Sequence, residues 1–359
     1  MTGGLSLARR FFIECVEPLV RSSRPDLRYA AALIGTGSEV LGFDTAMSTD
    51  HDWGPRLQMF LPDATFSETA PVLLETLEEG LLSEFDGWPT SFVDPGRPTT
   101  ADLPSGALGS THGVELFSLA GWMKRHLALE STEPLAVDDW LALPEQTLLE
   151  AVAGAVFRDD TGDLTVLRET LSYYPRDVWL YRLASQWQRI AEEQAFVGRA
   201  GEVGDDLGSR LIAARLLQAV VRLLFQIERV YAPYAKWLGT ALRRLPSAAH
   251  LAEHEHRVLT AETWEEREAA LVACYRLAAN LQLERGVPGA LLPVVGPYFG
   301  RPFTVINADE LAAGLRAKIS DENLRRRPLM GSVDQVSDNV SVLTNPARAR
   351  AFTLGLPGR

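Results

Sequence analysis

Two aspartates separated by a single residue are the most suggestive chemical feature of this sequence. Asp50 and Asp52 flank His51 and follow the pair Gly37-Ser38 after a spacer of eleven residues. In an extended strand, alternate side chains project to the same face, about 6.5–7 Å apart. Two carboxylates held side by side repel each other unless a cation lies between them, and hard oxygen ligands suit Mg²⁺ or Mn²⁺. The spacing therefore predicts that Asp50 and Asp52 bind a divalent metal ion.

A glycine-rich turn precedes the two acids. The apolar run Tyr29–Ile34 ends in Gly-Thr-Gly37-Ser38. The backbone N–H groups of such turns, together with a serine hydroxyl, hold phosphate oxygens. Gly37 and Ser38 are therefore candidate phosphate-binding residues.

The first 130 residues alternate between strand-like and helix-like patterns, and these elements must position the acids. Short apolar runs stopped by glycine or proline indicate buried strands, and leucines repeated at helical spacing indicate amphipathic helices. Strands are expected at 29–34, 56–61 and 114–119, and helices at 5–22, 67–85 and 122–127. This order predicts an α/β domain with an open, mixed sheet over residues 1–130.

Helical periodicity dominates residues 131–290 and predicts a mainly α-helical bundle domain. The expected helices are at 177–197, 205–231, 233–245 and 263–284. The last of them begins with a capping box, Thr263-x-x-Glu266. The segment 250–256, HLAEHEH, is interpreted as a solvated loop rather than a zinc site, because no fourth ligand is near.

A third segment, residues 291–359, mixes strand and helix signals and is expected to pack on the rest of the protein. A short strand is predicted at 303–306 and a helix at 307–319. The polar, alternating stretch 331–343 predicts an edge strand or an ordered arm.

Charge and composition narrow the possible partners. The formal net charge is −12, and only two cysteines occur among 359 residues. An acidic chain is a poor ligand for phosphate backbones, which makes nucleic acid an unlikely partner. The absence of an apolar run of about 18 residues argues against a membrane span, and together with the few cysteines it predicts a cytoplasmic protein.

The ordered set of glycine, serine, spacer and paired acids resembles the polymerase-beta-type nucleotidyltransferase superfamily. The matching positions are Gly37, Ser38, Asp50 and Asp52. The resemblance implies that the Gly-Ser turn binds the triphosphate of a nucleoside triphosphate (NTP) and that the aspartates hold the catalytic metals, Mg²⁺ or Mn²⁺. It also implies a third acid on a later strand. Glu115 is preferred because Val114, Leu116 and Leu119 give it a strand context; Asp94 and Asp102 remain alternatives.

The order of the two large domains is similar to that of aminoglycoside nucleotidyltransferases, in which a helical bundle follows the catalytic domain and forms the acceptor side of the cleft. The segment Tyr231–Trp237 and the tail Gly331–Gln335 look like those of an uncharacterised nucleotidyltransferase-like group, domain of unknown function 4037. Within this resemblance Lys236, Tyr231 and Tyr234 are candidate nucleotide-binding residues.

Two functions follow as hypotheses. The first is a two-metal nucleotidyltransferase that moves a nucleoside monophosphate, in particular AMP, from an NTP onto a hydroxyl of a small molecule or a protein. Attraction by carboxylates favours a cationic small-molecule acceptor. The alternative is a non-catalytic nucleotide-binding module with a regulatory or antitoxin-like role. A transferase acting on tRNA ends is disfavoured by the net charge.

Overall fold

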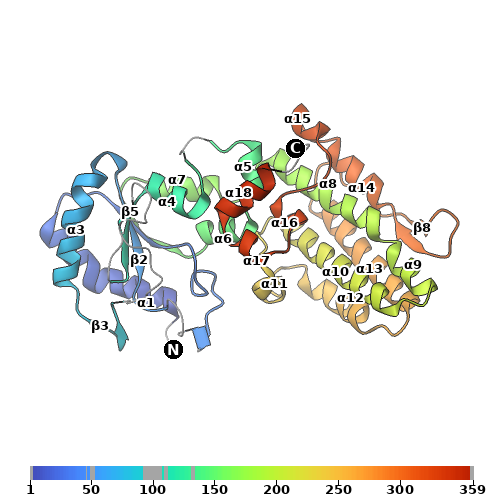
Figure 1. Ribbon diagram of the computed structural model, residues 1–359, viewed down its shortest axis with the longest axis horizontal. Coiled ribbons are helices and arrows are strands. Elements are labelled where there is room, and N and C mark those ends of the chain that lie inside the picture. The colour runs from blue at the N-terminus through green and yellow to red at the C-terminus, as the bar shows by residue number, and fades with distance from the viewer. Residues whose placement is uncertain are drawn as a thin grey trace. The chain divides into compact units, whose positions relative to one another are not determined.

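The computed structural model describes residues 3–45, 47–48, 53–91, 107–108, 112–130 and 134–355. Asp50, Asp52, Asp94 and Asp102 lie outside the described residues. The chain forms two compact units (Figure 1). Unit 1 comprises residues 1–134, 146–172 and 345–347, and unit 2 comprises residues 135–145, 173–344 and 348–359.

Unit 1 is built on a five-stranded mixed sheet with the strand order β5-β6-β2-β1-β7. Its strands are β1 (Ala30–Leu33), β2 (Leu57–Leu61), β5 (Ala107–Leu108), β6 (Val114–Ser118) and β7 (Ala155–Asp159). β2 and β6 are parallel, and the other neighbours are antiparallel. The predicted mixed sheet is confirmed, and so are the three strands expected at its centre.

One face of the sheet is apolar and is covered by helices. Leu57, Met59 and Leu61 alternate on β2, so they share one face, and there they join a buried core with Val114 and Leu116 of β6. Helices cover this face. They are α1 (Gly4–Phe11), the continuous π-helical turn η1 (Phe12–Val16), α2 (Glu17–Ser23) and, after the short turn η3 (Asp63–Thr65), α3 (Phe66–Gly80).

The opposite face carries polar residues at one end. Gln58 and Phe60 of β2 lie in register with Glu115 and Phe117 of β6. Helix α4 (Leu119–Leu127) follows β6 and packs on this face, where the Trp122 ring lies 6.2 Å from that of Phe60. The small hairpin β3 (Glu84–Phe85) and β4 (Trp88–Pro89) is separate from the main sheet.

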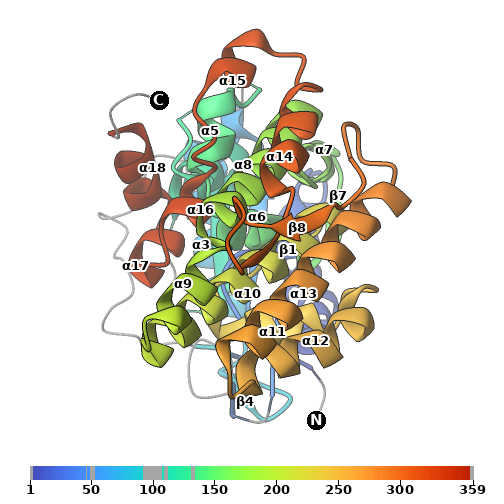
Figure 2. The same ribbon diagram turned by 90° about the vertical axis from the view of Figure 1, so that its right-hand side faces the viewer.

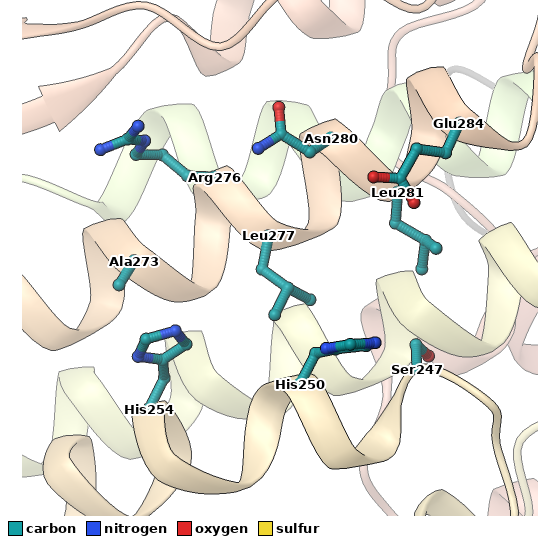
Figure 3. A pocket seen from close by; sticks show the side chains of 9 residues that line it. All are labelled: Ser247, His250, His254, Ala273, Arg276, Leu277, Asn280, Leu281 and Glu284. Carbon is teal, nitrogen blue, oxygen red and sulfur yellow. The ribbon is translucent and has the colours of Figure 1, made fainter.

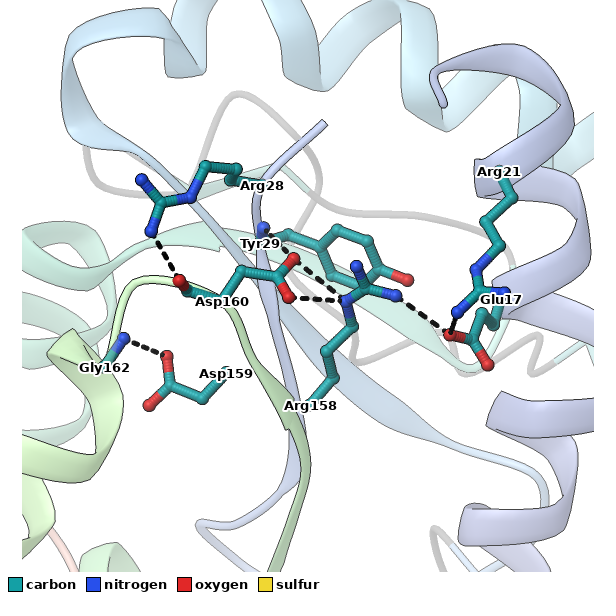
Figure 4. Close-up of polar contacts among 8 residues, drawn as sticks. All are labelled: Glu17, Arg21, Arg28, Tyr29, Arg158, Asp159, Asp160 and Gly162. Atoms are coloured by element: carbon teal, nitrogen blue, oxygen red, sulfur yellow. Dashed lines mark hydrogen bonds and ion pairs between the residues drawn. The ribbon is translucent and has the colours of Figure 1, made fainter. Parts of the chain in front are cut away.

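Strand β7 was not predicted, since residues 146–172 were assigned to the helical bundle. These residues form α6 (Glu145–Val152, whose first residue belongs to unit 2), β7 and α7 (Asp163–Thr170). β7 pairs with β1, and Figure 4 shows the polar contacts that fix it. Arg158 donates to Asp160 at 2.9 Å and to Glu17 at 2.9 Å, and Tyr29 N–H donates to Asp160 at 3.1 Å. An edge strand joined by such contacts is only half-buried, so its sequence lacks a continuous apolar signal.

Unit 2 is mainly helical. Its elements are α5 (Val137–Ala142), α8 (Arg176–Glu193), α9 (Phe196–Glu202), α10 (Asp206–Glu228), α11 (Ala235–Leu242), α12 (Ala248–Thr260), α13 (Trp264–Glu284), the hairpin β8 (Val295–Pro297) and β9 (Thr304–Ile306), α14 (Ala308–Arg316), α15 (Glu322–Arg326), α16 (Val333–Val336), α17 (Val340–Leu343) and α18 (Pro346–Leu354, whose first two residues belong to unit 1). Helices α10, α12 and α13 lie side by side (Figure 2).

The predicted helical bundle is confirmed, including the capping box of α13, where Thr263 accepts from Glu266 N–H at 3.2 Å. One local prediction is wrong, and so is one of the two alternatives of another. The histidine-rich segment 250–256 lies within α12, because Leu251 and Val258 provide a buried face that the polar alternation hides. Residues 331–343 form the helical turns α16 and α17 rather than an edge strand, and at the start of the first turn Ser332 N–H donates to the Gln335 side chain at 3.1 Å. No helix in the described part of the chain has the length and apolarity to cross a membrane.

Candidate functional site

The predicted site residues fall into three groups. Gly37, Ser38 and Glu115 belong to unit 1 and lie at one end of its sheet. Asp50 and Asp52 lie outside the described residues, so their roles stay predictions. The candidate nucleotide-binding residues of segment 231–236 belong to unit 2.

The turn after β1 requires glycine. Gly35 and Gly37 have φ angles of +88° and +133°, which side chains rarely adopt. A Cβ at Gly37 would also lie 2.2 Å from Nη2 of Arg56 and 2.7 Å from a carboxylate oxygen of Glu39. The turn is closed by the N–H of Phe43, which donates to the carbonyl of Ser38 at 2.8 Å.

This turn keeps several backbone donors open. Among the described residues, no backbone or side-chain acceptor pairs with the N–H groups of residues 36–40. Thr36 is exposed, and Gly37 and Ser38 are half-buried. Successive unpaired N–H groups in a turn of this kind form a concave site for an anion. The phosphate-binding role predicted for Gly37 and Ser38 is therefore chemically consistent with the geometry of the turn.

Arg56 brings a positive charge to the turn. Its Nε donates to Glu39 at 2.8 Å, and its Nη2 donates to the Thr36 carbonyl at 2.6 Å. Because Arg56 immediately precedes β2, the ion pair ties the start of that strand to the turn. Sequence analysis missed Arg56, since a single arginine before a strand carries no motif.

Glu115 lies at the same end of the sheet. Gln58, its neighbour in register on β2, accepts a hydrogen bond from Ile34 N–H at 3.1 Å, just before the glycine turn. Arg125 of α4 lies 3.6 Å from the Glu115 carboxylate, which is 19% exposed and therefore accessible from solvent. Because β1 is antiparallel to β2, and β2 is parallel to β6, the end of β1 lies at the same end of the sheet as the beginnings of β2 and β6.

His126 completes a group of basic side chains beside the turn. A Cβ at Gly35 would lie 3.7 Å from the His126 ring, which stacks on Trp122 with the centroids 4.8 Å apart. The Nε2 atom of His126 is shielded from solvent and has no partner among the described residues. Burial, and then repulsion by Arg125 and Arg56, lower the pKa of His126 from 6.5 to about 3. The imidazole is therefore neutral in the folded protein at physiological pH.

The depressed pKa of His126 makes the protein sensitive to acid. As the pH falls from 6.5 toward 3, the unfolded chain protonates this imidazole and the folded chain does not, so stability is lost, by on the order of 5 kcal/mol over the whole interval. We expect His126→Phe, which keeps a ring over Trp122, to flatten the dependence of unfolding free energy on pH between 4 and 6.5. Denaturant titrations across that range measure it, with His256→Gln at an exposed position as the control. Equal slopes in wild type and His126→Phe contradict the assignment.

The half-buried Glu150 of α6 also lies next to the turn. The backbone carbonyl of Glu150, on α6, accepts from Gly35 N–H at 2.8 Å. Burial raises the pKa of the Glu150 side chain to about 7, and Gln146 donates to it at 2.7 Å. No pattern in the sequence indicates Glu150, because only the pairing of β7 with β1 brings α6 to this end of the sheet.

The predicted nucleotide-binding residues of unit 2 have different environments. Tyr231 is 2% exposed and packs between Tyr173 and Tyr174, with ring centroids 5.1 and 5.3 Å away. Tyr234 is half-buried just before α11. Lys236 is exposed, with Nζ 4.8 Å from the centroid of the Trp237 ring. Packing accounts for Tyr231, and the nucleotide-binding roles of all three remain predictions.

Some of the carboxylates near the turn are already paired with other groups of the protein and are not available to a divalent cation. Over the described ranges, no group of three or more histidine, cysteine, aspartate or glutamate side chains is arranged to hold a metal ion. Glu39 is engaged by Arg56, and Asp44 accepts from Gly4 N–H at 2.9 Å. Glu115 is a partly exposed carboxylate at this end of the sheet, 3.6 Å from Arg125, and carboxylate oxygen is the donor that Mg²⁺ and Mn²⁺ prefer.

The chain is similar to a family model and to a solved structure. Residues 140–238 match the family model described as Domain of unknown function (DUF4037). That stretch includes Tyr231–Trp237, one of the segments that carried the resemblance in the sequence. A solved nucleotidyltransferase-like protein from Exiguobacterium sibiricum 255-15 has 14% identity over 81% of this chain and 82% of its own, with a TM-score of 0.33. No curated protein matches.

Proposed function

We propose that this protein is a metal-dependent nucleotidyltransferase, which transfers a nucleoside monophosphate, AMP in the first instance, from an NTP to a hydroxyl of a small molecule or a protein. The observation that carries the proposal is the turn at residues 35–43. It presents unpaired N–H groups at the end of β1, beside Arg56. Glu115, on β6, lies at the same end of the sheet, with β2 between the two strands. Triphosphate binding needs this combination of backbone donors and positive charge.

Phosphate binding is assigned to the turn and its arginines. The N–H groups of Gly37 and Ser38 would donate to phosphate oxygens, and Arg56 and Arg125 would balance their negative charge. Both arginines are paired with carboxylates in this structure, Arg56 with Glu39 and Arg125 with Glu115. A bound triphosphate would compete for these guanidinium groups, and in doing so would release the carboxylate of Glu115.

The transfer step requires a proton acceptor. The acceptor hydroxyl oxygen forms a bond to the α-phosphorus, the bond to the bridging oxygen breaks, and pyrophosphate leaves with the electron pair. Glu115 would take the hydroxyl proton as general base. When bound by Asp50 and Asp52, Mg²⁺ or Mn²⁺ supplies positive charge to the phosphate oxygens.

Nucleotide binding and turnover can be measured separately. We expect calorimetry to detect ATP binding in the presence of Mg²⁺, and an enzymatic assay to detect pyrophosphate release when amine-bearing alcohols are supplied as acceptors. Arg125→Gln should weaken ATP binding, whereas Glu115→Gln should leave binding largely intact and lower the release rate, by about 100-fold for loss of a general base. Lys124→Gln, an exposed change one residue from Arg125 on α4, is the matched control.

The outcomes separate the hypotheses. Binding without pyrophosphate release from any acceptor favours the non-catalytic nucleotide-binding module. Absence of ATP binding at millimolar concentration contradicts both functions. Equal binding by wild type and Arg125→Gln contradicts the assignment of the phosphate site to this end of the sheet.

A further inference from the structure

A cavity lies entirely within unit 2, in the groove between α12 and α13. Its volume is about 540 Å³, within the range of small-molecule sites. The two helices pack directly against each other, and Figure 3 shows the side chains that line the groove. Ala273, Leu277 and Leu281, spaced four residues apart on α13, form an apolar floor.

Polar side chains form the two sides of this groove. Arg276, Asn280 and Glu284 recur every four residues on α13 and are exposed along one rim. His250 and His254 lie one turn apart on α12, along the facing side. Within the described part of the chain, neither Arg276 nor Glu284 has an ion-pair partner. The rim therefore offers a free cation and a free anion.

Two buried polar atoms in the groove lack partners. Ser247, which precedes α12, is 3% exposed, and its hydroxyl makes no hydrogen bond with the described residues. The Nδ1 atom of His254 is also shielded from solvent and has no partner there. Buried hydroxyl and imidazole groups left unpaired cost free energy, and a bound molecule or ordered water that pairs with them removes that cost. These two unpaired atoms indicate a ligand site, and this observation is independent of the cavity volume.

We propose that this groove binds a small, elongated zwitterion, with a carboxylate at Arg276, an ammonium group at Glu284 and an aliphatic chain over Leu277 and Leu281. The two charged residues are eight positions apart on one helix, which is about 12 Å along its axis. Both side chains can bend inward over the floor and shorten that span. A molecule with two opposite charges about 7–8 Å apart therefore matches both ends, with the two histidines and Ser247 as further hydrogen-bonding groups.

Three probes of nearly the same shape test the proposal. 6-Aminohexanoate carries both charges, hexanoate lacks the ammonium group, and hexylamine lacks the carboxylate. The protein has six histidines, so the imidazole proton resonances of His250 and His254 can be resolved by NMR and assigned with His250→Gln and His254→Gln. We expect 6-aminohexanoate to shift both resonances with a Kd of about 1 mM, and each single-charge probe to bind about fivefold more weakly.

Charge-removing variants complete the experiment. Arg276→Gln should weaken 6-aminohexanoate and hexanoate but not hexylamine, and Glu284→Gln should weaken 6-aminohexanoate and hexylamine but not hexanoate. Arg257→Gln and Glu253→Gln, which remove an exposed pair on α12, are the matched controls and should change nothing. Equal binding of the three probes, or the same binding by wild type and the Arg276→Gln/Glu284→Gln double variant, would overturn the proposal. The result does not depend on nucleotidyl transfer.

Discussion

Asp50→Asn and Asp52→Asn, each made alone, are expected to lower the rate of nucleotidyl transfer by at least about 100-fold. Each substitution keeps the size of the side chain and removes its charge, so a bound divalent ion loses an anionic ligand. Stability should change little, because the proposed role is to hold an ion rather than to pack. Pyrophosphate release and the thermal midpoint, measured on the same preparations, test both parts.

Asp44→Asn is the matched control for these two variants. Asp44 lies in the same connection between β1 and β2, and its carboxylate accepts from the first N–H of α1. Loss of a charged acceptor at a helix start costs about 1 kcal/mol. Asp44→Asn should therefore lower the thermal midpoint and spare transfer. Full activity in both the Asp50 and Asp52 variants would refute the proposed metal site.

The largest effect on stability is expected for Arg182→Met. Arg182 and Glu145 are each 1% exposed in unit 2, with Nη2 of Arg182 3.0 Å from Oε1 of Glu145. The guanidinium also lies over the Tyr174 ring at 4.1 Å. Arg182→Met leaves the buried Glu145 carboxylate with the longer contact to Arg222, at 3.4 Å, so we expect a cost of about 3 kcal/mol, the lower end of the range for breaking a buried ion pair. Denaturant unfolding followed by circular dichroism measures this loss.

A second substitution distinguishes buried charge from lost packing. Arg182→Met/Glu145→Leu removes both charges, so part of the stability lost in Arg182→Met should return. Recovery of stability will be incomplete, because Glu145→Leu also removes the ion-pair partner of Arg222, which lies 3.4 Å from Glu145. Arg257→Met, which breaks an exposed pair with Glu253, should cost less than about 1 kcal/mol. A double variant that is less stable than the single one would show that the charges are not the cause.

Local patterns in the sequence were sufficient to predict the three central strands of the sheet and the start of α13. The apolar runs at 29–34, 56–61 and 114–119 became β1, β2 and β6, because buried strands need apolar side chains on both faces. The capping box at Thr263 located the start of α13, since its hydrogen bonds are made within four residues. Elements with weak burial were missed. β7 is half-buried along its length, and α12 shows polar alternation on its exposed side.

The sequence by itself determined the α/β and helical character of the two parts of the chain, and the glycine turn with Glu115 as candidate site residues. These features depend on periodicity and on backbone conformations that only glycine adopts easily, both of which are local properties. Only the tertiary structure brought Arg56, His126 and Glu150 to the turn and placed the histidines of α12 opposite Arg276. Such contacts depend on strand pairing and helix packing between distant segments, and no spacing along the chain encodes them.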